Sequence, residues 1–278
     1  MKVVLFCGGL GMRLREFSEA IPKPMVPVGY RPILWHTMRY YAHHGHKDFI
    51  LCLGYKSDSI KQYFLNYDET ISNDFVMSEG GKKVQLLGSD IQDWNVTFVD
   101  TGLHSNVGQR LKAVEPFLEN EPFFLANYSD GLSDLPLTSM VDFFVAREDA
   151  VACFAAVAPT STFHMVKVAQ GGRVESIRHV KDVGMRINGG FFVFRNEIFD
   201  WIREGEELVQ EPFQRLAGAG RLLAYEYDGF WACMDTFKEK QALEDMFSQG
   251  RSPWEIWKPR HHGSPPEPAR AQVLRVAK

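Results

Sequence analysis

The sequence predicts an α/β protein with a doubly wound, mostly parallel sheet, and two observations support this. Short apolar runs alternate with segments of helical spacing in the first third of the chain: strands at 1–6 and 48–53, helices at 33–45 and 57–65. This order is typical of parallel strands joined by crossover helices. The first apolar run also breaks into glycines, as a buried strand does where it opens into a ligand-binding loop.

The remaining chain continues the pattern as one predicted domain over residues 1–260. Residues 71–93 interrupt the rhythm and are predicted to form a hairpin-like excursion, beside the nucleotide site or in an oligomer contact, and a plain surface hairpin is an equally good alternative. Residues 261–278 are rich in Pro, Ala and Arg and are predicted to be a disordered tail. Further strands are predicted at 96–99, 123–127, 151–157, 165–168, 174–181, 187–194 and 222–227, and further helices at 196–201, 211–216 and 237–247.

Composition excludes several function classes. The net charge of −4 gives no broad attraction to nucleic acid or an anionic membrane, and no apolar run approaches the ~20 residues that span a bilayer. The four cysteines stand singly, without metal-ligand spacing, which favours a reducing cytoplasm. Four of the nine histidines lie on or after one predicted helix, where a partly exposed face is expected: His36, His43, His44 and His46.

The loop after the first strand carries the main functional signal. Gly8, Gly9 and Gly11 lack side chains, so backbone N–H groups can approach phosphate oxygens there. Arg13 adds a planar, permanently charged guanidinium, and Lys23 adds a point charge held between two prolines. On the loop alone, a strand-turn with two exposed cations is an equally good interpretation.

Two common phosphate-binding motifs do not fit this loop. A Walker loop requires Gly-Lys-Ser/Thr after the glycines, and that triplet is absent. The dinucleotide fingerprint requires a third glycine where Leu14 stands, and prolines at 22, 24 and 27 interrupt the helix that should follow. A triphosphate cradle with both Arg and Lys is the remaining interpretation.

Two aspartates are candidate metal ligands. Asp130 follows the predicted strand 123–127, and the carboxyl end of such a strand faces the ligand crevice of an open sheet. Mg²⁺ beside a triphosphate takes one or two carboxylates together with phosphate oxygens. Asp235 is the second candidate. A simple turn at Asp130 and a helix N-cap at Asp235 are the alternatives.

A family resemblance joins these motifs. Gly8-Gly9-Leu10-Gly11-Met12-Arg13-Leu14 with Pro22-Lys23-Pro24-Met25 resembles the signature of sugar-phosphate nucleotidyltransferases, with Met12 at a usual Thr or Ser. Similarity to the glucose-1-phosphate cytidylyltransferase branch runs from residue 1 to about 257. It rests on Pro32-Ile33-Leu34-Trp35-His36, Gly54-Tyr55-Lys56, Trp94-Asn95-Val96-Thr97, Val99-Asp100-Thr101-Gly102, Ile187-Asn188-Gly189-Gly190-Phe191-Phe192 and Phe230-Trp231 to Met234-Asp235-Thr236.

The resemblance implies a fold and an activity. The fold is Rossmann-like, with residues 1–135 mainly on the nucleotide side, 136–260 mainly on the sugar side, and a small β-rich sugar-side appendage. The implied reaction joins a sugar 1-phosphate to a nucleoside triphosphate with Mg²⁺, giving an NDP-sugar and pyrophosphate. CTP is favoured over UTP or dTTP, glucose 1-phosphate is the default acceptor, and a homo-oligomer is expected.

The resemblance also assigns roles to single residues. Arg13 and Lys23 are the expected catalytic residues, and Asp130 and Asp235 are the expected metal ligands. The expected nucleotide-binding residues are Gly8, Gly9, Gly11, Met12, Arg13, Lys23, Arg110 and Ser129, where Ser129 replaces a family glycine. The expected sugar-phosphate-binding residues are Asn188, Gly189, Lys181 and Arg186.

The acceptor side departs from the family pattern. Many relatives carry a Glu-Lys pair where this chain has His179-Val180-Lys181, and Lys181 or Arg186 is expected to supply the missing charge. The usual Gly-Arg-Phe-Gly is replaced at Thr162 and His164. A modified hexose or heptose 1-phosphate, or another phosphorylated acceptor, fits these changes. A non-catalytic homologue that only binds a nucleotide or sugar nucleotide is the alternative function.

Overall fold

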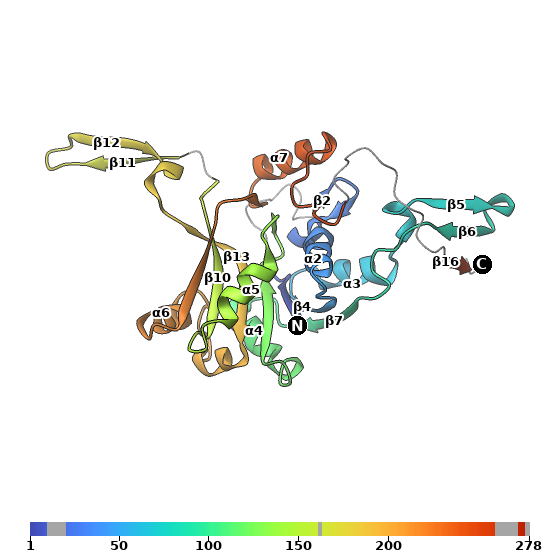
Figure 1. The fold of residues 1–278 in the computed structure, drawn as a ribbon, viewed down its shortest axis with the longest axis horizontal. Helices are drawn as coiled ribbons and strands as arrows, with labels where there is room; N and C mark the ends of the chain where they lie inside the picture. Colours follow the sequence, from blue (N-terminus) through green and yellow to red (C-terminus); the bar gives the residue numbers. More distant parts are fainter. Residues whose placement is uncertain (10–20, 161–162, 259–271, 276–278) are drawn as a thin grey trace.

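A seven-stranded sheet forms the centre of the protein (Figure 1). The computed structural model describes residues 1–9, 21–160, 163–258 and 272–275. The strand order is β14-β10-β13-β8-β1-β4-β7, in which β13 runs antiparallel to β10 and β8 and the other neighbours are parallel. The strands are β1 (Val3–Phe6), β4 (Asp48–Leu53), β7 (Asn95–Asp100), β8 (Phe123–Asn127), β10 (Ala152–Val157), β13 (Ile187–Arg195) and β14 (Leu222–Tyr227).

Helices cover both faces of this sheet, which confirms the doubly wound fold. Val3 and Leu5 of β1 pack in a core with α2, α3 and α5, whereas Val4 and Phe6 pack in a second core with α4 and α6. Both faces of β1 are therefore buried, as expected for a continuous apolar run. The helices are α2 (Ile33–His43), α3 (Ser57–Leu65), α4 (Val107–Ala113), α5 (Leu137–Val145), α6 (Glu211–Gly218) and α7 (Phe237–Ser248).

Most predicted elements are present. The predictions for 48–53, 57–65, 123–127 and 222–227 agree with β4, α3, β8 and β14 residue for residue. The helix predicted at 196–201 is a 3₁₀ helix, η7 (Asn196–Trp201). The sequence analysis missed α5, and it missed the two-residue pair β2 (Pro27–Val28) and β3 (Arg31–Pro32).

Two hairpins project from opposite ends of the molecule (Figure 1). One is formed by β11 (His164–Val168) and β12 (Val174–His179) and is the predicted β-rich appendage. The other, β5 (Phe75–Ser78) and β6 (Lys83–Leu86) around η4 (Glu79–Gly81), is the predicted excursion. β16 (Gln272–Arg275) pairs antiparallel with β6, so these four residues depart from the predicted disordered tail, whose other residues lie outside the described ranges.

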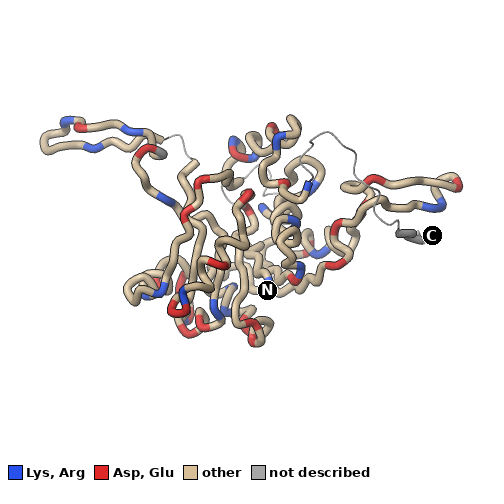
Figure 2. Tube along the Cα trace, viewed as in Figure 1, with Lys and Arg blue, Asp and Glu red and all other residues tan. Residues whose placement is uncertain are grey.

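Charge is distributed without a dominant sign. Figure 2 shows basic and acidic residues interspersed along the described trace, in line with the net charge of −4. Among the helices that the structure describes, none has the length and apolar character needed to cross a bilayer. The short 3₁₀ helices η3 (Glu69–Ile71) and η5 (Glu115–Phe117) lie in the connections that follow α3 and α4.

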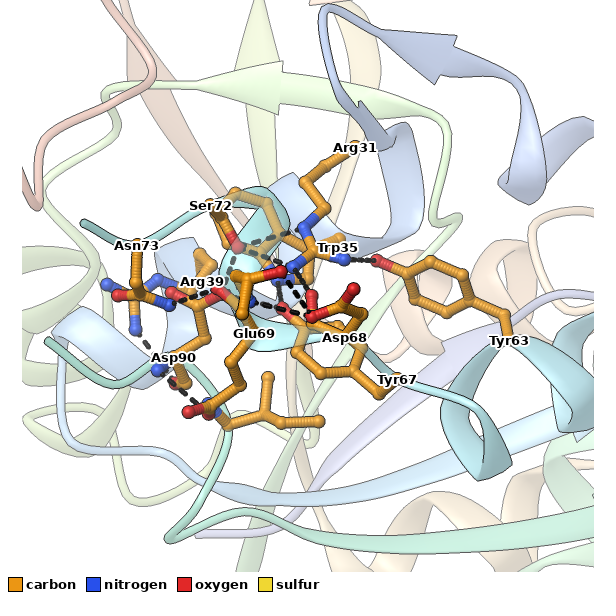
Figure 3. A network of polar contacts seen from close by, with 12 residues as sticks. Arg31, Trp35, Arg39, Tyr63, Tyr67, Asp68, Glu69, Ser72, Asn73 and Asp90 are labelled. Atoms are coloured by element: carbon orange, nitrogen blue, oxygen red, sulfur yellow. Dashed lines mark hydrogen bonds and ion pairs between the residues drawn. The ribbon is translucent and has the colours of Figure 1, made fainter. Parts of the chain in front are cut away.

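A buried polar network joins the excursion to α2 (Figure 3). Arg31 is 1% exposed, lies 3.6 Å from the Asp90 carboxylate and donates to the backbone carbonyl of Asp68 at 2.7 Å. The Tyr67 hydroxyl donates to Asp90 at 2.8 Å, and the Ser72 hydroxyl also donates to it. The charge of Arg31 is thereby compensated inside the protein.

His36 corrects one expectation from the sequence, because its side chain is fully buried. Its Nε2–H donates to the carbonyl of Val28 at 2.9 Å, and its Nδ1 accepts from the indole N–H of Trp254 at 3.3 Å. These partners require a neutral imidazole with the proton on Nε2. Burial lowers the pKa of His36 to about 4, mainly through desolvation of the charged form.

This pKa predicts a pH-dependent stability. The unfolded chain takes up a proton near the ordinary histidine pKa of about 6.5, whereas folded His36 stays neutral until about pH 4. The contribution of His36 to the free energy of unfolding is therefore complete above pH 6.5. It falls by about 3 kcal/mol as the pH drops to 4. Urea unfolding at several pH values measures how steeply the free energy of unfolding depends on pH between 4 and 6.5. This dependence should be shallower in His36→Gln. Equal slopes in the two proteins would contradict the assignment.

Candidate active site

The candidate site lies at one edge of the central sheet. The carboxyl ends of the parallel strands meet there, so Gly8 and Gly9 after β1 and Asp130 after β8 share that edge. β13 runs in the opposite direction, so its first residues, including Asn188 and Gly189, reach the same edge. The fold thus brings nucleotide-side and sugar-side candidates together.

Lys23 lies between the two candidate metal ligands. Its Nζ is 2.5 Å from Asp130 Oδ2 and 2.5 Å from Asp235 Oδ1. Lys23 opens the short 3₁₀ helix η2 (Lys23–Met25), and prolines on both sides restrict its backbone. The side chains of Lys23, Asp130 and Asp235 are 15%, 24% and 37% exposed, so the cluster is half-buried but reachable from solvent.

A short strand pair brings the two aspartates together. β9 (Gly131–Ser133) pairs antiparallel with β15 (Trp231–Cys233), with Gly131 opposite Cys233. The N–H of Met234 donates to the carbonyl of Asp130 at 2.9 Å, which fixes the residues just beyond the pair. Asp130 and Asp235, which are far apart in sequence, therefore lie close together at one end of this strand pair.

The N-cap of α7 is Thr236 and not Asp235. The Thr236 hydroxyl accepts from the N–H of Glu239 at 3.3 Å, and the Glu239 carboxylate accepts from the N–H of Thr236 at 2.9 Å. This capping box satisfies the helix start without the Asp235 carboxylate. The N-cap alternative for Asp235 is therefore wrong, and its carboxylate contacts Lys23.

Charge and burial oppose each other in this cluster. Burial alone would lower the pKa of Lys23, but the neighbouring Asp130 and Asp235 carboxylates outweigh it and raise that pKa. Burial raises the pKa of Asp130, while Lys23 lowers it in part and the like charge of Asp235 raises it further. The adjacent Lys23 ammonium therefore favours the charged form of Asp130.

The two glycines of the loop differ in their surroundings. A Cβ at Gly8 would lie 2.2 Å from the Arg110 guanidinium, whereas a Cβ at Gly9 would meet no atom of the described residues within 4 Å. Arg110 is 2% exposed and donates to Thr101 Oγ1 at 2.7 Å and to the carbonyl of Leu53 at 3.1 Å. Arg110 thus lies against the loop from inside the protein, and Gly9 offers open backbone.

Ser129 shapes the turn that carries Asp130. Its φ of 61° lies in the left-handed region, which favours glycine. Its hydroxyl donates to the carbonyl of Phe6 at 2.8 Å, and its N–H donates to Asn127 Oδ1 at 2.7 Å. Both of its donors are used within the protein and the side chain is buried, so the structure gives it a supporting position.

On the sugar side, Asn188 and Gly189 are held by two aromatic residues. The Asn188 amide donates to the Tyr128 hydroxyl at 3.2 Å and accepts from the N–H of Gly190 at 2.9 Å. The Trp231 indole donates to the carbonyl of Gly189 at 2.8 Å, and a Cβ at Gly189 would lie 3.2 Å from that nitrogen. A side chain at position 189 would therefore be tightly packed.

Trp231 and Tyr128 are site residues that the sequence analysis left without a role. The only signal for Trp231 was its place among the segments that resemble the family. Together with Phe163 and Met246, Trp231 lines a cavity of about 390 Å³ beside β15 and α7.

The predicted sugar-phosphate cations are placed only in part. The Arg186 guanidinium lies 2.7 Å from Asp228 and 3.3 Å from Glu226, so two acids at the end of β14 already balance its charge. Lys181 belongs to the 3₁₀ helix η6 (Val180–Val183), and its side chain lies outside the described part. Gly11, Met12 and Arg13 also lie outside the described residues, so their roles stay predictions.

Comparisons with known proteins show the family to which the chain belongs. Residues 2–236 match the Nucleotidyl transferase family. A glucose-1-phosphate cytidylyltransferase of Salmonella typhi is 42% identical over 260 residues, which are 92% of this chain and all of that protein. A probable glucose-1-phosphate cytidylyltransferase of Bacillus subtilis is 35% identical over 92% of this chain and all of that protein.

The fold is also found among solved structures. A UDP-glucose pyrophosphorylase in complex with UDP-glucose superposes with a TM-score of 0.65 at 15% identity, over 90% of this chain and 99% of that one. This identity is too low to support more than the fold, whereas the family match covers most of the chain. The protein is a member of the nucleotidyl transferase family.

Proposed function

We propose that the protein joins a sugar 1-phosphate to CTP and releases pyrophosphate, with glucose 1-phosphate as the default acceptor. The observation that carries this proposal is the convergence of Lys23, Asp130 and Asp235 at the sheet edge that also holds the open backbone of Gly9. The names of the two cytidylyltransferases support the choice of CTP and of the sugar.

The chemistry explains why these residue types suffice. A sugar phosphate oxygen attacks the α-phosphorus of the triphosphate in line, and the phosphate monoester is itself the nucleophile. The protein must therefore position two anions and neutralise their charge. In this proposal Lys23 bridges the α-phosphate and the incoming phosphate, and Arg13 stabilises the departing pyrophosphate.

The two aspartates fit a Mg²⁺ ion. Both carboxylates already point at one cation, the Lys23 ammonium. Within the described ranges no group of three or more His, Cys, Asp or Glu residues is arranged to hold a metal, so the other ligands would be phosphate oxygens and water, as Mg²⁺ prefers. Bound there, Mg²⁺ would neutralise charge on the reacting phosphates.

The loop provides a matched pair of variants. Gly8→Ala should lower the free energy of unfolding by about 1–3 kcal/mol, because its Cβ must displace the buried Arg110 guanidinium. Gly9→Ala should change stability by less than about 0.5 kcal/mol and weaken CTP binding about tenfold, because the new methyl group lies where phosphate should approach the backbone. Urea unfolding and calorimetric titration with CTP measure both. Unchanged CTP affinity in Gly9→Ala would contradict the phosphate role.

A homo-oligomer is also part of the proposal. Phe75, Val76 and Met77 of the β5–β6 hairpin are 43–64% exposed, which is unusual for consecutive large apolar residues. Light scattering after size-exclusion chromatography should give a mass above that of one chain. A monomer at micromolar concentration would contradict this part of the proposal.

The contacts on the acceptor side also fit a second candidate function. Arg186 is engaged by Asp228 and Glu226, so it is less suited to replace the family's sugar-phosphate lysine. A modified hexose or heptose 1-phosphate remains a candidate acceptor, and a homologue that only binds the nucleotide is the alternative function.

One experiment distinguishes these functions. CTP, UTP, dTTP and GTP are each combined with several sugar 1-phosphates and Mg²⁺, and pyrophosphate release is measured. Turnover with CTP and one sugar 1-phosphate is the expected result. Binding of one triphosphate without turnover of any pair would contradict the enzymatic proposal and favour the binding homologue.

A further inference from the structure

The position of Lys23 has a consequence for metal binding. A single Nζ atom contacts one oxygen of Asp130 and one of Asp235, each at 2.5 Å. A divalent ion bound by both carboxylates needs the same space between them. Two positive charges so close would repel each other strongly in a half-buried site. The ammonium and the metal ion therefore exclude each other there.

We propose that Lys23 is an internal counter-ion that keeps divalent metal out of the site until the nucleotide arrives. This inference rests on the proposed function, because it takes Asp130 and Asp235 as the metal ligands. The triphosphate gives the ammonium a new anionic partner, so Lys23 moves from the carboxylates to phosphate. Lys23 then no longer stands between the two carboxylates, and the metal binds there together with the nucleotide.

Lys23 has a restricted backbone and a flexible side chain, which together allow its ammonium to move from carboxylate to phosphate. Its backbone is fixed by η2 and by Pro22 and Pro24, so the ammonium remains in the site whichever anion it contacts. The side chain itself has four rotatable bonds and can turn from one partner to another. Asp130 and Asp235 are 24% and 37% exposed, so ions from solvent can reach them once Lys23 has left.

The exchange also keeps a cation beside the Asp130 carboxylate in both states. A carboxylate at this depth is stabilised by an adjacent cation. Lys23 supplies that cation before the nucleotide binds, and the metal ion supplies it afterwards. The observed affinity for metal alone is then reduced by the small fraction of molecules in which Lys23 has left the carboxylates.

Binding of Mn²⁺ alone, measured by electron paramagnetic resonance of the free ion at pH 8, tests the proposal without any turnover. Nucleotide-free wild-type protein should bind Mn²⁺ weakly, and Lys23→Met should bind it at least about tenfold more tightly. Lys23→Met combined with Asp235→Asn should lose this gain. Lys47→Met is the matched control, because Lys47 pairs with one exposed carboxylate, Asp93, and should leave Mn²⁺ binding unchanged.

Two results would overturn the proposal. One is tight Mn²⁺ binding by nucleotide-free wild-type protein, which requires no variant to fold. The other is equal Mn²⁺ affinity in wild type and Lys23→Met; Lys23→Gln, which also lacks the charge, replaces Lys23→Met if circular dichroism shows the latter to be unfolded. A gain in Mn²⁺ affinity in a protein without transferase activity would support the counter-ion and reject the proposed enzyme. Turnover without a gain in Mn²⁺ affinity would support the proposed enzyme and reject the counter-ion.

Discussion

Asp235→Asn is expected to lower kcat by at least about 10²-fold with little loss of stability. The substitution keeps the shape of the side chain and removes the charge that contacts Lys23 Nζ at 2.5 Å. It also removes one of the two proposed Mg²⁺ ligands, so two groups that neutralise phosphate charge are affected at once. The helix start is unaffected because Thr236 forms the capping box. Steady-state kinetics of pyrophosphate release measures the effect.

Asp228→Asn is the matched control for this variant. Asp228 lies seven positions earlier, is 82% exposed and contacts Arg186 at 2.7 Å. An exposed pair of this kind contributes little to stability. Activity close to that of wild type is expected. If Asp235→Asn were as active as Asp228→Asn, the role of the acid pair would be wrong.

Asp90→Asn is expected to lower the free energy of unfolding by about 3–5 kcal/mol. The substitution removes the carboxylate charge next to Arg31, whose side chain is 1% exposed. Arg31 would keep its hydrogen bonds to Ser72 and Tyr63, but its buried charge would lose its counter-ion. Urea unfolding followed by circular dichroism measures the loss.

Asp93→Asn serves as the control, three positions away and in the same segment. Asp93 is 62% exposed and pairs with Lys47, so its removal should change stability by less than about 1 kcal/mol. Similar losses in the two variants would show that the network of Figure 3 does not depend on its charge.

The central sheet could be predicted because most of its strands are mainly apolar runs. Strands buried on both faces have no polar side chains to interrupt the run, as in β1 and β4. Asp130 could be singled out because it follows a strand end, Lys23 because it stands between prolines, and Asp235 because of the family resemblance. Their mutual contacts could not be predicted, because they depend on the three-residue ladder of β9 and β15, which carries no sequence pattern of its own.

Other features depend on tertiary neighbours that no local pattern encodes. His36 is buried against residues outside its own helix. Its hydrogen bonds go to the Trp254 indole, 218 positions later in the chain, and to the carbonyl of Val28, 8 positions earlier. The resemblance implies a sugar-phosphate role for Gly189, which stays a prediction, whereas the indole of Trp231 that donates to its carbonyl comes from a distant segment. No local pattern indicates the burial of Arg31, whose polar partners Asp68, Ser72 and Asp90 all come from later segments of the chain.

A crystal structure of the protein with CTP and Mg²⁺ would test the central claim directly. The triphosphate should lie over the backbone of Gly8 and Gly9, with the metal ion between Asp130 and Asp235 and the Lys23 ammonium on phosphate. A nucleotide bound away from this loop, or a metal ion remote from the two carboxylates, would contradict the account.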